Sequence, residues 1–200
     1  SLHDALPIST TTATFTNTTL KLCAAGTTSA CALTTLTVAN EGTYTVSSGT
    51  VLFTPVAGFT GTATPVTYEI KDNFATSNPQ TVSALLTVKV IPAPTAVADT
   101  ESGNLQAPIT VDVTANDTPA TGTTLDKTSV KLCAVGTTSA CALTSVTIAG
   151  KGVYSVNSSG VVTFAPETAY VGTAPTITYS INDAVGNVAT STVTRSEEHT

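Results

Sequence analysis

The sequence predicts an all-β protein built from tandem immunoglobulin-like antiparallel β-sandwich modules. Residues 21–39 and 131–149 are nearly the same sequence, identical at 15 of 19 positions with an offset of 110 residues. A fixed period of this length indicates tandem copies of one structural unit. Short segments alternate apolar and polar residues, and threonine, a β-branched residue that favours strands, supplies 45 of the 200 residues.

Period-two alternation places the strands in order along the chain. It is clearest at residues 66–70, 109–113 and 177–181, where one face is apolar and the other polar. Shorter strands are expected at residues 130–133, 143–148, 153–156, 161–164 and 188–193. Gly, Pro, Asn and Asp punctuate these segments, and no helical periodicity of useful length is present. About seven short strands in about 100 residues are typical of a β-sandwich.

The aromatic residues are few, so they are expected to fill the two cores rather than to stack on sugars. In the order of the chain they are Tyr44, Phe53, Phe59 and Tyr68 in the first copy and Tyr154, Phe164, Tyr170 and Tyr179 in the second.

The two ends of the chain are expected to be foreign to it. Residues 1–8 and 195–200 can be encoded by DNA stretches that are partly reverse complements of each other, as sequencing-adapter read-through would be. We therefore predict that both are adapter-derived artefacts and exclude them from the argument on function. Both histidines lie in these ends, and the remainder carries six basic and ten acidic residues.

Two modules are expected between these ends, joined near Pro92 and Pro94, which favour extended backbone. Module one covers residues 9–91 and is expected to be truncated at its N-terminus, because it lacks a counterpart of residues 98–118. Module two covers residues 92–194 and is expected to stop within its last strand. An incomplete sandwich exposes a strand edge, so we expect self-association through this gap.

The four cysteines recur at equivalent places, and four cysteines allow three pairings. Repeat symmetry favours disulfides within each module, Cys23 with Cys31 and Cys133 with Cys141. Free or metal-bound thiols are the weaker alternative, and a metal is disfavoured because histidine and Cys-x-x-Cys motifs are absent from this stretch. Disulfides indicate an oxidising compartment outside the cytoplasm.

No catalytic or cofactor-binding residue is predicted. Serine and threonine are abundant, but no histidine lies between the ends to activate one of them. Calcium is the one cofactor kept open, with Asp99, Glu101, Asp112 and Asp117 as its candidate ligands; the favoured interpretation of the other turn aspartates is capping. A covalent crosslink through Lys21 and Lys131 is a further alternative, and outward-facing lysines are the simpler explanation.

Nucleic acid and membrane are not expected partners. The six lysines are scattered and the balance is acidic, which gives no phosphate-binding footprint. No apolar run approaches the roughly 20 residues of a membrane span.

The stretch at residues 42–72, GTYTVSSGTVLFTPVAGFTGTATPVTYEIKD, and its counterpart at 152–183 resemble the CshA-type fibril repeat of bacterial surface adhesins. Module one matches the motif nearly throughout. Module two departs from it at Ala165, Tyr170 and the Pro175-Thr176 pair. The Asn116-Asp117 turn is similar to the one that follows the first strand of such repeats.

The resemblance implies a bacterial cell-surface or secreted protein in which many repeats form a fibril. The repeats of such proteins act as a stalk, while a separate region binds host or neighbouring cells, and no catalytic residue or cofactor comes with the family. The expected partners of this chain are therefore neighbouring repeats. The alternatives are a repeat that itself binds a glycan or a surface protein, and an accessory domain of a secreted enzyme.

Overall fold

A computed structural model of the chain describes residues 14–73, 79–104, 107–168 and 170–197. It divides into two compact units, the first ending at Val90 and the second beginning at Ile91. Strands dominate both units, as the sequence predicts, and the single helical element is a 3-10 turn among the described residues, η1 (Asn17–Thr19).

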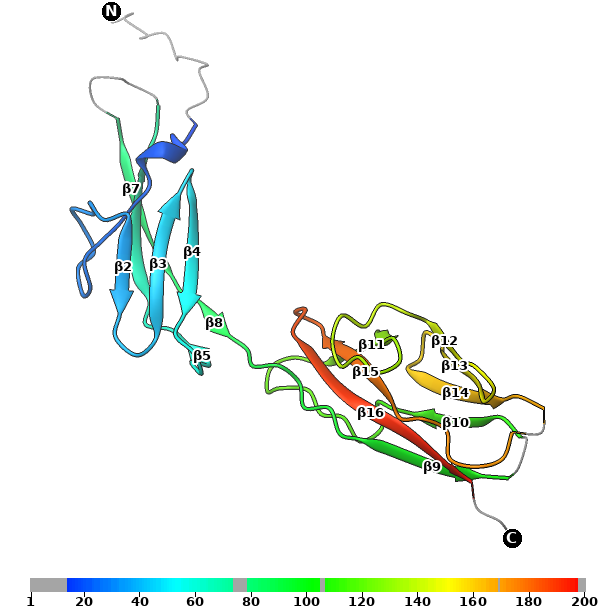
Figure 1. The fold of residues 1–200 in the computed structure, drawn as a ribbon. Helices are drawn as coiled ribbons and strands as arrows, with labels where there is room; N and C mark the ends of the chain where they lie inside the picture. The colour runs from blue at the N-terminus through cyan, green and yellow to red at the C-terminus, as the bar shows by residue number, and fades with distance from the viewer. Residues whose placement is uncertain (1–13, 74–78, 105–106, 169, 198–200) are drawn as a thin grey trace, which may run out of the picture. The chain divides into compact units, whose positions relative to one another are not determined.

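Unit 1 contains two three-stranded sheets and one short strand pair (Figure 1). One sheet has the order β2 (Thr35–Val38), β3 (Gly42–Ser47) and β4 (Thr50–Pro55). The other has the order β1 (Lys21–Leu22), β6 (Val66–Lys71) and β7 (Thr81–Leu86). Two short strands, β5 (Gly61–Thr62) and β8 (Lys89–Val90), pair with each other, and all of these pairings are antiparallel.

Unit 2 contains two four-stranded sheets. The first has the order β10 (Ile109–Asp112), β14 (Val161–Pro166), β13 (Gly152–Val156) and β12 (Ser145–Ile148). The second has the order β11 (Leu125–Leu132), β15 (Ile177–Asp183), β16 (Val188–Glu197) and β9 (Asp99–Gly103). β16 includes Arg195 to Glu197, which belong to the end predicted to be adapter-derived, and the origin of that end stays a prediction.

The register shows how closely the two units repeat each other. Tyr44 lies opposite Phe53 between β3 and β4, and Tyr154 lies opposite Phe164 between β13 and β14. The ring centroids are 4.6 Å apart in both units. Relative to unit 2, the described part of unit 1 lacks a strand beside β4 in the place of β10 and a strand beside β7 in the place of β9.

One pairing differs from the antiparallel arrangement that we expected. β9 and β16 run parallel, with Val193 opposite Asp99 and Glu197 opposite Gly103. Parallel neighbours need a long crossover between them, and the whole of unit 2 supplies it, because β9 is its first strand and β16 its last (Figure 1).

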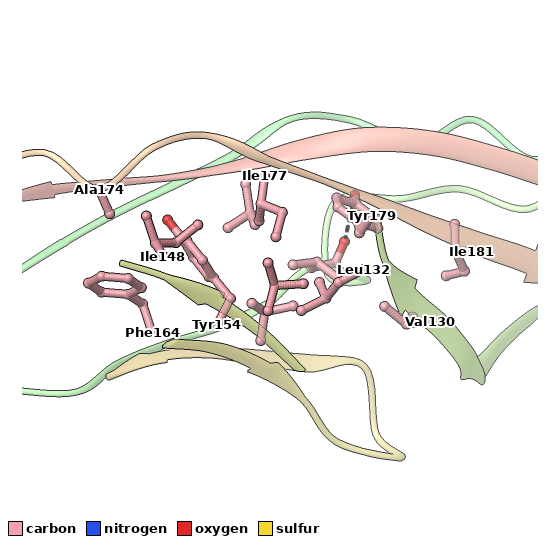
Figure 2. Packing of buried hydrophobic residues seen from close by; sticks show 13 residues of the cluster. Val130, Leu132, Ile148, Tyr154, Phe164, Ala174, Ile177, Tyr179 and Ile181 are labelled. Carbon is pink, nitrogen blue, oxygen red and sulfur yellow. Dashed lines mark hydrogen bonds between the residues drawn. The ribbon is translucent and has the colours of Figure 1, made fainter. Parts of the chain in front are cut away.

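The core of unit 2 lies between its two sheets (Figure 2). Its buried members are Val113, Val130, Leu132, Val146, Ile148, Tyr154, Val162, Phe164, Ala174, Ile177, Tyr179, Ile181 and Val193. Among the described residues of unit 1, the corresponding cluster has four buried members, Leu22, Tyr44, Ala63 and Val66. The same sequence pattern therefore buries much less apolar surface in unit 1.

Candidate functional site

The cysteine loop is the feature that both units share most exactly. Disulfides join Cys23 to Cys31 and Cys133 to Cys141. The first cysteine of each pair is buried and follows a sheet strand, and its backbone N–H donates to the next strand over, at 2.9 Å in both units. The loops turn through glycines at φ +75°. Each loop is thus held at its base by the sheet and closed by the sulfur bridge.

Loss of the second disulfide is expected to destabilise unit 2 alone. Replacing both Cys133 and Cys141 by alanine frees a short loop in the unfolded chain, which should lower the free energy of unfolding by about 2–3 kcal/mol. Urea unfolding followed by amide NMR signals of each unit measures this. The matched control replaces Cys23 and Cys31, which should affect unit 1 instead. Equal unfolding midpoints for all three proteins would contradict the prediction.

The four carboxylates considered for calcium do not all come together. Asp112 makes an ion pair with Lys127 at 3.2 Å and accepts a hydrogen bond from the Thr114 hydroxyl at 2.6 Å. Glu101 is exposed on β9. Among the described residues, the one cluster of three potential metal ligands is Cys23, Cys31 and Glu69, and its two sulfurs are already joined to each other.

Asp99 and Asp117 do meet, around the hydroxyl of Tyr179. That hydroxyl lies 3.1 Å from both carboxylate oxygens of Asp117 and 3.1–3.2 Å from the carbonyl oxygens of Val97 and Val113. Asp99 and Asp117 are 7% and 6% exposed. The Tyr179 hydroxyl thus connects β15 to Val97, which precedes β9, and to Val113, which follows β10. Sequence reasoning missed this cluster, because Tyr179 is 62 residues from Asp117 and 80 residues from Asp99, and only the fold brings them together.

Burial raises the pKa of Asp99 to about 6. The neighbouring Asp117 charge raises this pKa further, whereas side-chain hydrogen bonds to Asp99 lower it. Burial also raises the pKa of Asp117, and burial next to these carboxylates raises that of Tyr179. The cluster therefore holds its protons more tightly in the folded state than in the unfolded chain.

Unit 2 is expected to become less stable as the pH rises from about 4 to about 7. The pKa of Asp99 is about 6 in the folded state and 3.8 as the ordinary aspartate value, so the folded state binds this proton more tightly. The resulting stabilisation is complete below pH 3.8 and is lost as the pH rises through about 6. The loss is on the order of 2 kcal/mol. Asp112 and Asp183 have lowered pKa values, so their contribution is lost only below that range.

Thermal melting at pH 4.5 and pH 7.5 tests this expectation. The variant Asp99→Asn should be more stable than the parent at pH 7.5 and should lose most of the pH dependence. The control Asp126→Asn removes a half-buried carboxylate of β11 that lies outside the cluster. A parent protein that melts higher at pH 7.5 than at pH 4.5 would show that the cluster does not behave in this way.

The eight aromatic residues predicted for the cores are members of the two core clusters or pack against them. Tyr44 and Tyr154 are 0% and 1% exposed, and their hydroxyls donate to the carbonyl oxygens of Thr64 at 3.1 Å and Pro175 at 3.0 Å. Phe59 and Tyr170 pack edge-on against the neighbouring phenylalanine of each unit. With rings buried and hydroxyls bonded, Tyr44 and Tyr154 offer no face to a sugar.

One concave pocket lies beside the first cysteine loop. It has a volume of about 330 Å³ and is lined by residues of that loop together with Leu36, Pro65 and Leu85. Its walls are mostly apolar and aliphatic, without an aromatic ring among the lining residues. Within the part of the chain that the structure describes, no helix has the length and hydropathy needed to span a bilayer.

Fold and site together define a class: a tandem array of β-sandwich repeats, each with its own core and its own disulfide-closed loop. The family model described as the surface adhesin CshA repetitive domain matches the chain twice, at residues 5–90 and 91–196. The chain belongs to this family of surface adhesin repeats, which is not an enzyme family. The resemblance seen in the sequence is therefore confirmed.

Other comparisons add little. A search among curated proteins found no match. Among solved structures, the crystal structure of the human desmocollin-1 ectodomain is similar at 11% identity and a TM-score of 0.30, covering 67% of this chain and 26% of that one. The chain thus spans about a quarter of that ectodomain, and a similarity this weak carries no argument about function.

Proposed function

We propose that this chain is a stalk segment of a bacterial cell-surface fibrillar adhesin. The observation that carries the proposal is the pair of family repeats, each an independent sandwich closed by its own disulfide. Such units can be strung in series to any length without depending on distant parts of the chain. The role is mechanical: the repeats hold an adhesive region away from the cell.

The location outside the cytoplasm follows from the same features. Disulfides persist where thiols are not continually reduced, which favours export and cell-surface display. A count of free thiols in protein exported through an oxidising compartment tests this point. If the folded protein had four free thiols, the cysteines would no longer support this location, and the family match would be its only support.

A bead assay separates a stalk from a repeat that binds directly. Beads carrying only this chain should not adhere to host or bacterial cell layers. Beads that display a known ligand-binding tag on one, two or four copies in series should adhere to immobilised ligand more efficiently as the number of copies grows. Adhesion of the untagged beads would instead favour the alternative, a repeat that binds a glycan or surface protein by itself. The pocket beside the first cysteine loop would then be the place to look.

A further inference from the structure

An open groove about 500 Å³ in volume lies on unit 1 between its two sheets. Its apolar walls come from both sheets and from the segment before β1: Val51 from one sheet, Tyr68, Ile70, Val82 and Leu86 from the other, and Phe15 and Leu20 from that segment. β4 and β7, which border it, are the outer strands of their sheets among the described residues. Within the part of the chain that the structure describes, no strand pairs with the outer edges of β4 and β7, and the apolar side chains between them are only partly covered.

Unit 2 shows what occupies the equivalent place. There β10 lies beside β14, the counterpart of β4, and β9 lies beside β16, the counterpart of β7. The residues equivalent to the groove walls are closed off: Val162, Ile181 and Val193 are 1%, 0% and 3% exposed. Their unit 1 counterparts Val51, Ile70 and Leu86 are only partly buried. The difference comes from the apolar side chains of the β10 segment, namely Ile109, Val111 and Val113.

Tyr68 supplies a polar contact for such a segment. Its counterpart Tyr179 is fully buried, and its hydroxyl contacts the main-chain oxygens of Val97 and Val113, which flank β9 and β10. In unit 1 the Tyr68 side chain is half-buried and lines the groove. The groove therefore offers apolar walls, two strand edges and a hydroxyl in the arrangement that unit 2 uses to hold its own strands.

We propose that the groove of unit 1 binds an extended polypeptide segment of the type found at residues 97–118, supplied by another repeat of this family. Its backbone adds to the edges of β4 and β7, its alternate β-branched side chains fill the groove, and Tyr68 contacts its main chain. A small molecule or a lipid would leave the two strand edges without hydrogen-bond partners. This surface is independent of the stalk role, since a binding repeat of the same fold would have it too.

A synthetic peptide of residues 97–118 with a fluorescent label tests the proposal on the full chain. We expect saturable binding with a dissociation constant on the order of 10 µM, because burial of three apolar side chains is offset by the ordering of a flexible peptide. Binding should slow amide exchange in β4 and raise the melting temperature of unit 1 by several degrees. A peptide with Ile109→Asn, Val111→Asn and Val113→Asn should bind at least 10-fold more weakly.

Variants of the chain locate the binding face. Val82→Lys places a charge in the groove at a side chain that is already 46% exposed, and should weaken binding at least 10-fold without unfolding the unit. Leu85→Lys is the matched control, because it lies on the opposite face of the same strand and is 64% exposed. Tyr68→Phe should weaken binding about 3-fold to 10-fold through loss of one hydrogen bond.

Three results would overturn the proposal. The first is a chain that does not bind the peptide, and the second is binding that Val82→Lys and Leu85→Lys weaken equally. The third comes from sedimentation: if the chain dimerises and excess peptide neither binds nor dissociates the dimer, the groove takes a different partner. A dimer that the peptide dissociates would support the proposal and identify a second copy as one source of the strand.

Discussion

Gly152→Ala is expected to unfold unit 2 at room temperature or to lower its free energy of unfolding by about 3 kcal/mol or more. Gly152 has φ +152°, and a Cβ built there would lie 2.8 Å from both the Phe164 ring and the Pro166 Cα, besides meeting the carbonyl oxygen of Ala165. Two of these neighbours are backbone atoms of the paired strand β14, and the third is a core ring. None can give way without opening the sheet.

The measurement is urea unfolding followed by far-UV circular dichroism and by NMR signals of each unit. Gly150→Ala is the matched control in the same turn: its φ is +70°, but its Cβ would meet nothing within 4 Å, so only about 1 kcal/mol of backbone strain is expected. Gly42→Ala, the equivalent change in unit 1, should be as damaging there, since its Cβ would lie 2.6 Å from the Phe53 ring. Equal stability of the Gly150 and Gly152 variants would contradict the steric argument.

Arg195→Val is expected to stabilise unit 2 by about 1–4 kcal/mol. Arg195 is 2% exposed, its guanidinium carbon lies 5.2 Å from the centre of the Phe164 ring, and Nη2 donates to the Asn104 carbonyl oxygen at 3.5 Å. The strand registers place it at the position of Val88, because Val193 lies opposite Ile177 as Leu86 lies opposite Val66. Val88 packs against the core of unit 1. Moving a charge out of water is costly, and valine is the residue that the repeat itself uses there.

The measurement is the melting temperature of the parent and of the variants Arg195→Val and Val88→Arg. Each variant gives one unit the residue that the other unit has at the equivalent position. Val88→Arg should destabilise unit 1, which makes it the reciprocal control. A higher melting temperature for Arg195→Val also supports the prediction that residues 195–200 are foreign to the protein, because a native strand end would be adapted to its own core. A lower melting temperature would argue that Arg195 belongs where it is.

The sequence was sufficient for the repeat, the strand-rich fold and the core aromatics. These features depend on local patterns: period-two alternation at residues 177–181, or the cysteines that recur at an offset of 110. It was not sufficient for β9, whose residues Asp99–Gly103 contain one β-branched residue and no large apolar side chain. That strand forms because β16 offers it an edge, which is a tertiary effect.

The same reason explains the other differences. β11 begins at Leu125, five residues before the strand that alternation predicted, because Leu125 and Asp126 pair with the far end of β15 across an irregularity in the ladder. The carboxylates at Asp99 and Asp117 looked like candidate calcium ligands together with Glu101 and Asp112. Their meeting at Tyr179 depends on three segments that only the completed sandwich brings together.

The parallel pairing of β9 with β16 has a mechanical consequence. β9 is where the chain enters the unit and β16 is where it leaves, so pulling the two ends apart draws these neighbouring strands along their length in opposite directions. The pairs Asp99–Val193 and Thr100–Thr194, which lie before the end predicted to be foreign, are then loaded in shear, and their hydrogen bonds bear the force together. A hairpin at the same position would peel open one bond at a time. In the proposed stalk, such a unit would resist extension through the geometry of its first and last strands.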